Sequence, residues 1–291
     1  MRAFVIGNAA LDETFDVDVF PRPGESVFGR TGTSGLGGKG ANQAVMLGRC
    51  GVTTTLSAPI GRDARGDALR RALAAEPLDC ATIDIDGVAT DTSIVMRAGT
   101  GENTIVTTQD AALSLDAGRA VAVLDGAAPG DWVVLQGNLA PETTLAILRA
   151  AAARGLRAAI NPSPLRPGYT AFWPMVDVVF VNDGEATALG EADALLDAGV
   201  GQVVRTLGGD GAILIGPHGT ESVDAAPAEI VDTTGAGDCF MAVALASACL
   251  RGLEGVDARA LRSAARAAAI AVSRPGTVSA FPTTAEMRGM L

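Results

Sequence analysis

The sequence predicts an α/β protein in which helices cover both faces of a mainly parallel central sheet and a small β-sheet forms a lid. Its 291 residues are 48% hydrophobic but only 4% aromatic, which provides enough aliphatic side chain for a large core. Apolar runs typical of strands alternate with helical patterns over most of the chain. Two further segments alternate polar and apolar residues, which indicates strands exposed on one face.

The expected strands are continuous apolar runs, as found where a strand is buried on both faces of a sheet. They lie at residues 3–7, 132–135, 156–160, 176–181, 202–207 and 212–215. Helical patterns are found at residues 41–50, 65–75, 116–124, 141–154 and 184–189, and two long, small-residue helices are expected at 237–250 and 258–272. Because parallel strands need a crossover connection, usually a helix, this alternation predicts a mainly parallel sheet.

The lid is expected from residues 12–34 and 90–108. The first segment alternates polar and apolar residues around Pro-Arg-Pro-Gly, and the second is typical of a hairpin that turns at residues 99–103. We assign both segments to a small lid over the main sheet. Neither a repeat nor a low-complexity linker interrupts the chain, so residues 1–291 are expected to form a single domain.

Charge and composition argue against several classes of protein. The 22 basic and 33 acidic residues leave a formal charge of −11, and no basic run is present to hold a phosphate backbone. The longest apolar stretch, residues 239–250, is shorter than the roughly 20 residues that span a bilayer. The N-terminus lacks a signal-peptide layout, and four cysteines without CxxC spacing indicate reduced thiols. We expect a soluble, cytoplasmic protein without nucleic-acid or membrane partners.

Two residue types occur once each. His218, in the turn-like GPHGT, is the single histidine, which excludes a His-rich zinc site. Lys39 is the single lysine, and every other basic side chain is arginine or that histidine. This pattern suggests that a compact ammonium group is needed at position 39, with chance as the alternative.

Lys39 lies in a glycine-rich stretch, GLGGKGANQA at residues 35–44. The stretch contains G-x-G-x-x-G, but it does not directly follow a buried strand as a dinucleotide fingerprint does. It is not a P-loop either, because Gly40 stands where a serine or threonine follows the lysine. It is typical of a glycine-rich entry to a helix, where bare backbone approaches a small polar ligand and Lys39 and Asn42 add donors. A plain structural turn is the alternative.

A second glycine turn, DTTGAGD at residues 232–238, leads into an apolar helix. Residues 235–237 form a nest whose N–H groups can bind an oxyanion or a phosphate. Asp238 lies in the first helical turn, where the helix dipole keeps a carboxylate ionised and able to act as a base. By itself this pattern also fits an N-cap aspartate. Together with the first turn, which suits a polyol, it describes phosphoryl transfer to a hydroxyl.

Two weaker patterns follow expected strands. Asn182 and Glu185, in NDGE, are spaced to share the water shell of a Mg²⁺ ion, although a helix cap has the same pattern. The turn TLGGDG at residues 206–211 fits nucleotide binding beside the phosphates, with a purely structural turn as the alternative.

In this order, GGKGANQA at 37–44, NDGE at 182–185, TLGGDG at 206–211 and DTTGAGD at 232–238 resemble the ribokinase family of carbohydrate kinases. Further similar stretches are RDARGDALRRAL at 62–73, GENTIV at 101–106 and AAAIAVSRPG at 267–276. The resemblance covers nearly the whole chain. It implies a ribokinase-like fold and ATP-dependent phosphorylation of a sugar's primary hydroxyl, with D-ribose as the leading candidate.

The resemblance also implies roles for the matching residues. Asp238 would be the base, and the anion hole for the γ-phosphoryl group would be formed by Gly235, Ala236 and Gly237. The sugar would be bound by Asp12, Gly37, Gly38, Lys39, Asn42, Asn138 and Asp238. ATP would be bound by Asn182, Thr206, Leu207, Gly208, Gly209, Asp210, Gly211 and Gly237, with Mg²⁺ held through water by Glu185. A monovalent cation, expected to be K⁺, would be held by Asp232, Thr234, Ala271, Arg274, Gly276 and Ala280. Family members often pair the lids of two subunits, which implies a homodimer.

Two positions depart from ribokinases proper. Ala10 stands where ribokinases have a sugar-binding asparagine, and Asn138 stands where they have a glutamate. A lost partner for a buried sugar hydroxyl costs about 1–3 kcal/mol, so these changes bear on which sugar is bound. A kinase of a nucleoside, or of another sugar or sugar acid, is therefore the alternative. A sugar- or nucleotide-binding protein without turnover is a more remote one, and the intact DTTGAGD argues against it.

Overall fold

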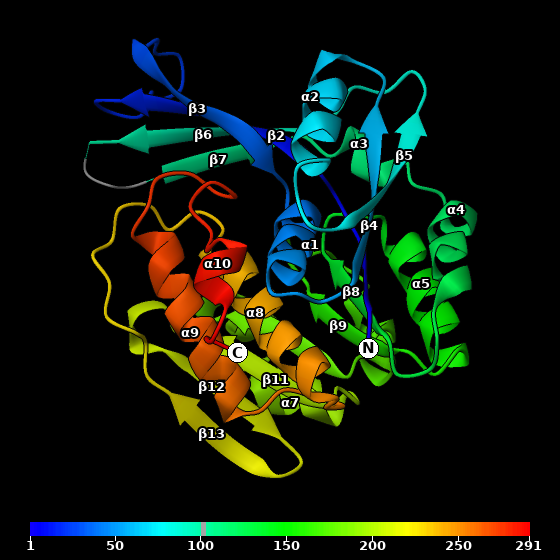
Figure 1. Cartoon of the computed structure of the whole chain (residues 1–291). Coiled ribbons are helices and arrows are strands. Elements are labelled where there is room, and N and C mark those ends of the chain that lie inside the picture. The colour runs from blue at the N-terminus through cyan, green and yellow to red at the C-terminus, as the bar shows by residue number, and fades with distance from the viewer. Residues whose placement is uncertain (100–102) are drawn as a thin grey trace.

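The computed structural model describes residues 1–99 and 103–291, which form two β-sheets with helices packed around the larger one (Figure 1). The larger sheet has the strand order β13-β12-β11-β10-β9-β8-β1-β4-β5, and the smaller has the order β3-β2-β6-β7. The predicted fold class, an α/β protein with a small separate sheet, is confirmed.

Most elements lie where the sequence predicts them. The strands are β1 (Ala3–Ile6), β2 (Ala10–Val17), β3 (Gly29–Gly37), β4 (Thr54–Gly61), β5 (Asp79–Ile85), β6 (Thr92–Ala98), β7 (Asn103–Thr107), β8 (Trp132–Gln136), β9 (Arg157–Asn161), β10 (Val178–Asn182), β11 (Gln202–Thr206), β12 (Ala212–Gly216) and β13 (Gly219–Val223).

The α-helices are α1 (Lys39–Arg49), α2 (Ala64–Leu73), α3 (Asp110–Leu113), α4 (Ala117–Ala122), α5 (Pro141–Ala153), α6 (Asp183–Ala188), α7 (Glu191–Asp197), α8 (Ala236–Arg251), α9 (Ala258–Val272) and α10 (Thr284–Met287). Short 3₁₀ turns are η1 (Val123–Gly126), η2 (Tyr169–Ala171), η3 (Trp173–Met175) and η4 (Gly208–Asp210). Within the described ranges, no helix is both long enough and apolar enough to cross a membrane.

β1 lies inside the larger sheet, where it pairs in parallel with β4 on one edge and β8 on the other. Parallel pairing continues outward from β4 to β5, and from β8 through β9 and β10 to β11. β12 and β13 then complete the sheet in antiparallel orientation. The sheet is therefore mainly parallel, as the sequence predicts.

Successive side chains of β1 enter two different hydrophobic cores. Ala3 and Val5 pack into a core shared with α1, α8 and α9, whereas Phe4 and Ile6 pack into a second core shared with α5. Because side chains alternate across a strand, these cores lie on opposite faces of the sheet. Burial on both faces explains why β1 is a continuous apolar run.

Three strands, β4, β5 and β13, were not predicted. β4 reads TTLSAPIG, so threonine, serine and Pro59 interrupt the apolar run although the strand is mostly buried. β5 and β13 form the two edges of the larger sheet, and β13, reading GTESV, is exposed along most of its length. An edge strand with an exposed face needs few apolar residues, so it leaves little periodic signal in the sequence.

The smaller sheet corresponds to the segments predicted as a lid at 12–34 and 90–108. β2 pairs antiparallel with β3 and parallel with β6, and β6 and β7 form an antiparallel hairpin. The predicted hairpin turn at 99–103 includes residues 100–102, which lie outside the described residues. In Figure 1 this sheet lies at one end of the molecule, and the chain runs from β3 directly into α1.

Candidate active site

The chain enters α1 through glycines that pack directly against the backbone following β1. A Cβ on Gly40 would lie 2.7 Å from the Asn8 carbonyl oxygen, closer than Cβ atoms come in proteins. Gly38, the residue before α1, has a φ of 89°, which L side chains rarely adopt. These contacts bring the first turn of α1, with Lys39 and Asn42, against the end of β1.

The second glycine turn begins α8. Gly235 is the N-cap with a φ of 76°, and a Cβ there would lie 2.8 Å from Cγ2 of Thr277. The Ala236 N–H donates a long 3.3 Å bond to the Thr233 carbonyl, and the space beside Gly237 is open. The N–H groups at the positive end of a helix form a binding site for an oxyanion.

Asp238 lies in this first turn of α8, and its side chain is only 5% exposed. Asn42 Nδ2 donates to its Oδ2 at 2.9 Å, and Gln43 Nε2 donates to its Oδ1 at 2.9 Å. Lys39 Nζ lies 4.0 Å from Oδ1. The two amides hold the carboxylate in one orientation, and the ammonium group offsets part of the cost of burying it. The two glycine-rich motifs therefore form one site.

Gln43 and Gln136 were not among the predicted site residues. Gln136 ends β8 and donates through Nε2 to Gln43 Oε1 at 2.7 Å, so the Gln43 nitrogen faces Asp238. Both glutamines are almost fully buried. The signal that could have found them is a polar amide in an otherwise apolar setting, because buried polar groups are nearly always paired.

Asp12, on β2 of the lid, accepts a 3.0 Å hydrogen bond from Thr277 Oγ1. Burial raises the pKa of Asp12 to about 6; the hydroxyls of Thr277 and Ser93 act in the opposite direction, and the charge of Asp238 raises it further. Gly37 makes room for this carboxylate, because a Cβ there would lie 2.1 Å from it. Asp12 also lines a cavity of about 260 Å³ between the lid strands and the loop that carries Thr277.

Asn138 is buried in the loop after β8, where Arg166 Nε donates to the neighbouring Gly137 carbonyl at 2.7 Å. The Oδ1 atoms of Asn138 and Asn42 are buried and find no hydrogen-bond partner in the described part of the chain. A buried acceptor without a donor costs free energy, so both oxygens suit the hydroxyl groups of a ligand. No hydrogen bond among the described residues joins Asn138 to the other predicted sugar residues.

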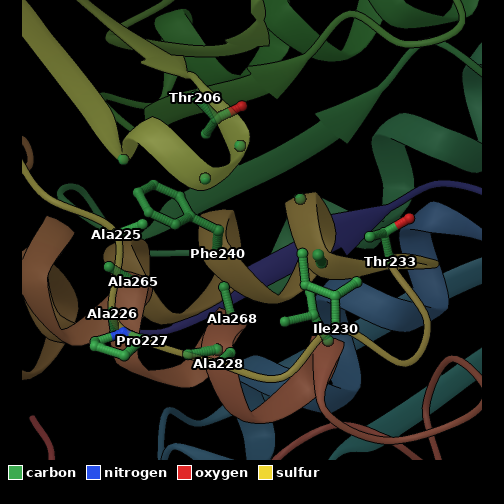
Figure 2. Close-up of a pocket in the computed structure, with 17 residues that line it drawn as sticks. Thr206, Ala225, Ala226, Pro227, Ala228, Ile230, Thr233, Phe240, Ala265 and Ala268 are labelled. Carbon is green, nitrogen blue, oxygen red and sulfur yellow. The ribbon is translucent and has the colours of Figure 1, made fainter.

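A cavity of about 470 Å³ opens beside the start of α8 (Figure 2). The predicted ATP residues that line it are Thr206, Gly208, Gly209, Gly211 and Gly237. Its other walls are Ala225, Ala226, Pro227, Ala228, Ile230, Thr233, Ala236, Phe240, Ala265, Ala268, Ala269 and Val272. Apart from Ala236, these were not predicted, because alanine and other small apolar residues carry no chemical signal. The small apolar walls suit a flat base, and the glycine turns suit phosphate oxygens.

Four predicted ATP and magnesium residues lie outside the lining of this cavity. Leu207 and Asp210 shape the turn instead, through bonds from the Leu207 N–H to the Gly211 carbonyl and from the Asp210 N–H to Leu207. Asn182 and Glu185 form a capping box at the start of α6: Asn182 Oδ1 accepts from the Glu185 N–H at 2.8 Å, and Glu185 Oε2 accepts from the Asn182 N–H at 3.0 Å.

The loop before α8 holds a second buried carboxylate, that of Asp232. Its Oδ1 accepts from the Thr234 N–H at 2.9 Å, and its Oδ2 accepts from the Gly276 N–H at 3.1 Å. Thr234 Oγ1 is buried without a hydrogen-bond partner among the described residues. A buried carboxylate beside an unpaired hydroxyl is a donor set that fits a monovalent cation. Nη1 of Arg97, on the lid, lies 3.4 Å from Asp232 Oδ2, a contact that was not predicted.

The other predicted cation residues follow in the chain. The Ala271 carbonyl accepts from the Arg274 N–H at 3.3 Å where α9 ends, and the Arg274 guanidinium pairs with Glu286. The Ala280 N–H donates to the Thr277 carbonyl at 3.0 Å. Hydrogen bonds therefore join Asp232, Thr234 and Gly276 in one cluster. Ala271 and Arg274 are joined to each other instead, by the backbone hydrogen bond at the end of α9.

These features place a nucleotide-sized cavity and a buried carboxylate at the start of one helix, in an α/β fold with a small second sheet. Residues 2–284 match the model of the pfkB family of carbohydrate kinases. The chain therefore belongs to the pfkB family of carbohydrate kinases. The predicted resemblance and the predicted carbohydrate-kinase class are confirmed.

The chain is 31% identical to the ribokinase of Bacillus subtilis over 298 residues, which covers 99% of this chain and 98% of that relative. Its structure is similar to that of ribokinase from Giardia lamblia, with a TM-score of 0.87 at 26% identity, covering 100% of this chain and 99% of the other. It is also similar to the ribokinase of Cryptococcus neoformans in complex with ADP, with a TM-score of 0.85 at 28% identity over 100% and 99% of the two chains.

Proposed function

We propose that the chain transfers the γ-phosphoryl group of ATP to the primary hydroxyl of a furanose-like sugar, with D-ribose as the leading candidate. The observation that carries this proposal is the environment of Asp238, a buried carboxylate held by Asn42 and Gln43 at the start of α8. The proposal is supported by the ribokinase names of the full-length relatives. The nucleotide-sized cavity reaches the same helix start through Ala236 and Gly237.

In this proposal Asp238 accepts the proton of the attacking hydroxyl as its oxygen approaches phosphorus. The N–H groups of Gly235, Ala236 and Gly237 stabilise charge on the transferring phosphoryl oxygens. Lys39 and Asn42 change partners from Asp238 to the sugar, and Asp12 accepts from a sugar hydroxyl beneath the lid. Removing water from this site strengthens each of these interactions.

Two cations belong to the proposal. Magnesium would neutralise charge on the triphosphate, and Glu185 would reach it through water, which suits an ion that keeps several waters. K⁺ would be held at the loop of Asp232 and Thr234, together with Ala271, Arg274, Gly276 and Ala280. The unpaired hydroxyl of Thr234 beside the buried Asp232 carboxylate supports a cation there.

Positions 10 and 138 bear on which sugar the chain phosphorylates. Ala10 supplies no polar side chain, and Asn138 presents a neutral amide whose Oδ1 lacks a partner in the described residues. A nucleoside, or another sugar or sugar acid, is therefore the second candidate, favoured by these two positions.

We further propose a homodimer that forms through the lids. Ile94 and Val106 lie directly opposite each other on β6 and β7, and both are exposed. Phe28, before β3, is fully exposed as well. Exposed apolar side chains gathered on one small sheet support a protein interface at that place.

The test is ADP formation by the purified protein with Mg²⁺, K⁺ and ATP against a panel of pentoses, hexoses, sugar acids and nucleosides. Asp238→Asn should lower kcat by about three orders of magnitude, since it removes the base, while ADP still binds. Asp193→Asn is the matched control, because Asp193 is an exposed aspartate in the first turn of α7. Equal turnover by the Asp238→Asn variant and the wild type would remove Asp238 from its role.

The panel decides the substrate. Preference for D-ribose by kcat/KM would show that Ala10 and Asn138 are tolerated in a ribose pocket. A much better substrate elsewhere in the panel would show that these positions redirect the pocket. Absence of turnover with every member would contradict the proposed function.

A further inference from the structure

Arg97 on lid strand β6 lies between two carboxylates that belong to different parts of the molecule. Its Nε donates to Asp16 Oδ1 on the neighbouring strand β2 at 2.9 Å. Its Nη1 lies 3.4 Å from Oδ2 of Asp232, in the loop that leads to α8. The Arg97 side chain is 26% exposed, whereas that of Asp232 is 6% exposed. A positive charge from the lid thus reaches a buried carboxylate beside the proposed anion hole.

The register of the lid explains how Arg97 reaches this position. In the parallel pairing of β2 with β6, Asp12 lies beside Ser93 and Asp16 lies beside Arg97. Because side chains alternate across a strand, all four lie on one face of the lid. This face is the one whose Asp12 accepts from Thr277.

Asp232 needs a counter-ion because it is buried. Two backbone N–H groups, of Thr234 and Gly276, satisfy its oxygens but bring no net charge. A buried carboxylate without an opposite charge is unfavourable, and a guanidinium group on the same oxygen provides that charge. Gly276 also precedes Thr277, so order in this loop extends to the partner of Asp12.

We propose that Arg97 is a positioning residue that neutralises Asp232 from the lid, in the role that a bound monovalent cation has in the proposed function. K⁺, when present, would replace Arg97 on this carboxylate, and Arg97 serves as the counter-ion when K⁺ is absent. This chain therefore keeps its loop ordered, and keeps most of its turnover, without K⁺. The inference rests on the proposed function for its kinetic part only. Its structural part, the neutralisation of Asp232, is tested by thermal unfolding alone, without any measurement of activity.

The test compares wild type with Arg97→Met, which keeps most of the side-chain volume and removes the charge. Thermal unfolding and kcat/KM for the best sugar of the panel are measured in K⁺ and in tetramethylammonium at equal ionic strength. For wild type, kcat/KM should change less than about twofold between the two salts, and Tm should hardly change. For Arg97→Met, K⁺ should raise Tm clearly and raise kcat/KM about tenfold or more.

Three further variants serve as controls. Arg97→Lys keeps a charge, so its response to K⁺ should lie between those of wild type and Arg97→Met. Arg30→Ala removes an exposed arginine of β3 on the same lid and should behave as wild type. Asp16→Asn removes the charge of the carboxylate that orients Arg97. It should increase the Tm response to K⁺ in the same direction as Arg97→Met, so the test stays decisive if Arg97→Met folds poorly.

Two results would overturn the inference. One is a wild type that already loses most of its kcat/KM without K⁺. The other is an equal Tm response to K⁺ in wild type, Arg97→Met and Asp16→Asn. Both leave the kinase proposal intact, because sugar-dependent ADP formation is measured in the same samples. A wild type inactive on the whole panel contradicts the proposed function instead, and the Tm response still decides the role of Arg97.

Discussion

At the scale of single residues, two aspartates of the site, Asp238 and Asp12, have different surroundings. Asp238 accepts from two side-chain amides, and Lys39 lies nearby. Asp12 is paired with hydroxyls, and burial raises its pKa to about 6. In the proposed function, this difference suits two separate roles: Asp238 accepts a proton during transfer, and Asp12 accepts a hydrogen bond from a sugar hydroxyl.

The pH dependence of sugar binding follows from Asp12. Below about pH 6 Asp12 becomes protonated and accepts less well from a sugar hydroxyl. We expect KM for the sugar to rise severalfold between pH 7.5 and pH 5.5, with a smaller effect on kcat. Steady-state kinetics at the two pH values measure this, and Asp12→Asn should remove the pH effect on KM. An unchanged wild-type KM would contradict the assignment of Asp12 to the sugar.

The same shift has a consequence for stability without sugar. The folded-state pKa of Asp12, about 6, lies above the ordinary value of 3.8, so this group favours the folded state most below pH 3.8. That contribution is lost as pH rises through about 6, where the buried group ionises. At pH 7.5, Asp12→Asn should therefore be more stable than wild type, by about 1–3 kcal/mol in urea unfolding. This measurement also shows that weaker sugar binding by the variant does not come from loss of the fold.

At the scale of elements, the site depends on the junction of β8, α1 and α8. The chain of side-chain amides runs from Gln136 on β8 through Gln43 on α1 to Asp238 on α8. The order of donors is fixed at one end, because a carboxylate can only accept. The Gln43 amide must then present its oxygen to Gln136, so the three elements share one orientation of the base.

Substitution of Gln43 tests this junction. Gln43→Leu removes one donor from Asp238 and leaves the Gln136 amide unpaired in a buried place, which is unfavourable. We expect kcat to fall about tenfold or more, with a smaller change in sugar KM, since Asn42 and Lys39 remain. Gln43→Glu, which nearly preserves the shape, places a second carboxylate beside Asp238 and should move the acid limb of the kcat profile to higher pH. Wild-type profiles in both variants would contradict the positioning role.

The elements that could be predicted from sequence are those with a strong period or a chemical motif. β1, β8, α8 and α9 have apolar patterns set by burial, and DTTGAGD identifies the start of α8. The edge strands β5 and β13 and the alanine-rich walls of the nucleotide cavity lack such a signal. Gln136 and Arg97 could not be predicted for another reason: their partners are 93 and 135 residues away in the chain, so only the fold shows the contact.

At the scale of the whole molecule, the lid packs against the rest of the chain through Leu11 and Leu36 and also makes polar contacts near the site. Asp12 contacts Thr277, and Arg97 contacts Asp232. Phosphoryl transfer needs water excluded from the site, so we expect the lid to close further over bound sugar.

Hydrogen exchange measures this closure. Amide exchange in β2, β3 and β6 should slow when the preferred sugar is added, because the lid becomes held at a second surface. β13, at the far edge of the larger sheet, is the internal control and should exchange at the same rate with and without sugar. Unchanged exchange in the lid strands at saturating sugar would contradict closure.

During synthesis, β1 leaves the ribosome before the other strands of the larger sheet, although it lies inside that sheet with a neighbour on each side. One of its neighbours, β4, follows at Thr54, but the other, β8, begins only at Trp132. A growing chain therefore carries an apolar strand with one unpaired edge until nearly half of it has been made, and such an edge invites aggregation. After β8, the strands β9 to β13 each pair with the one made just before, so the second half of the sheet can grow in the order of translation.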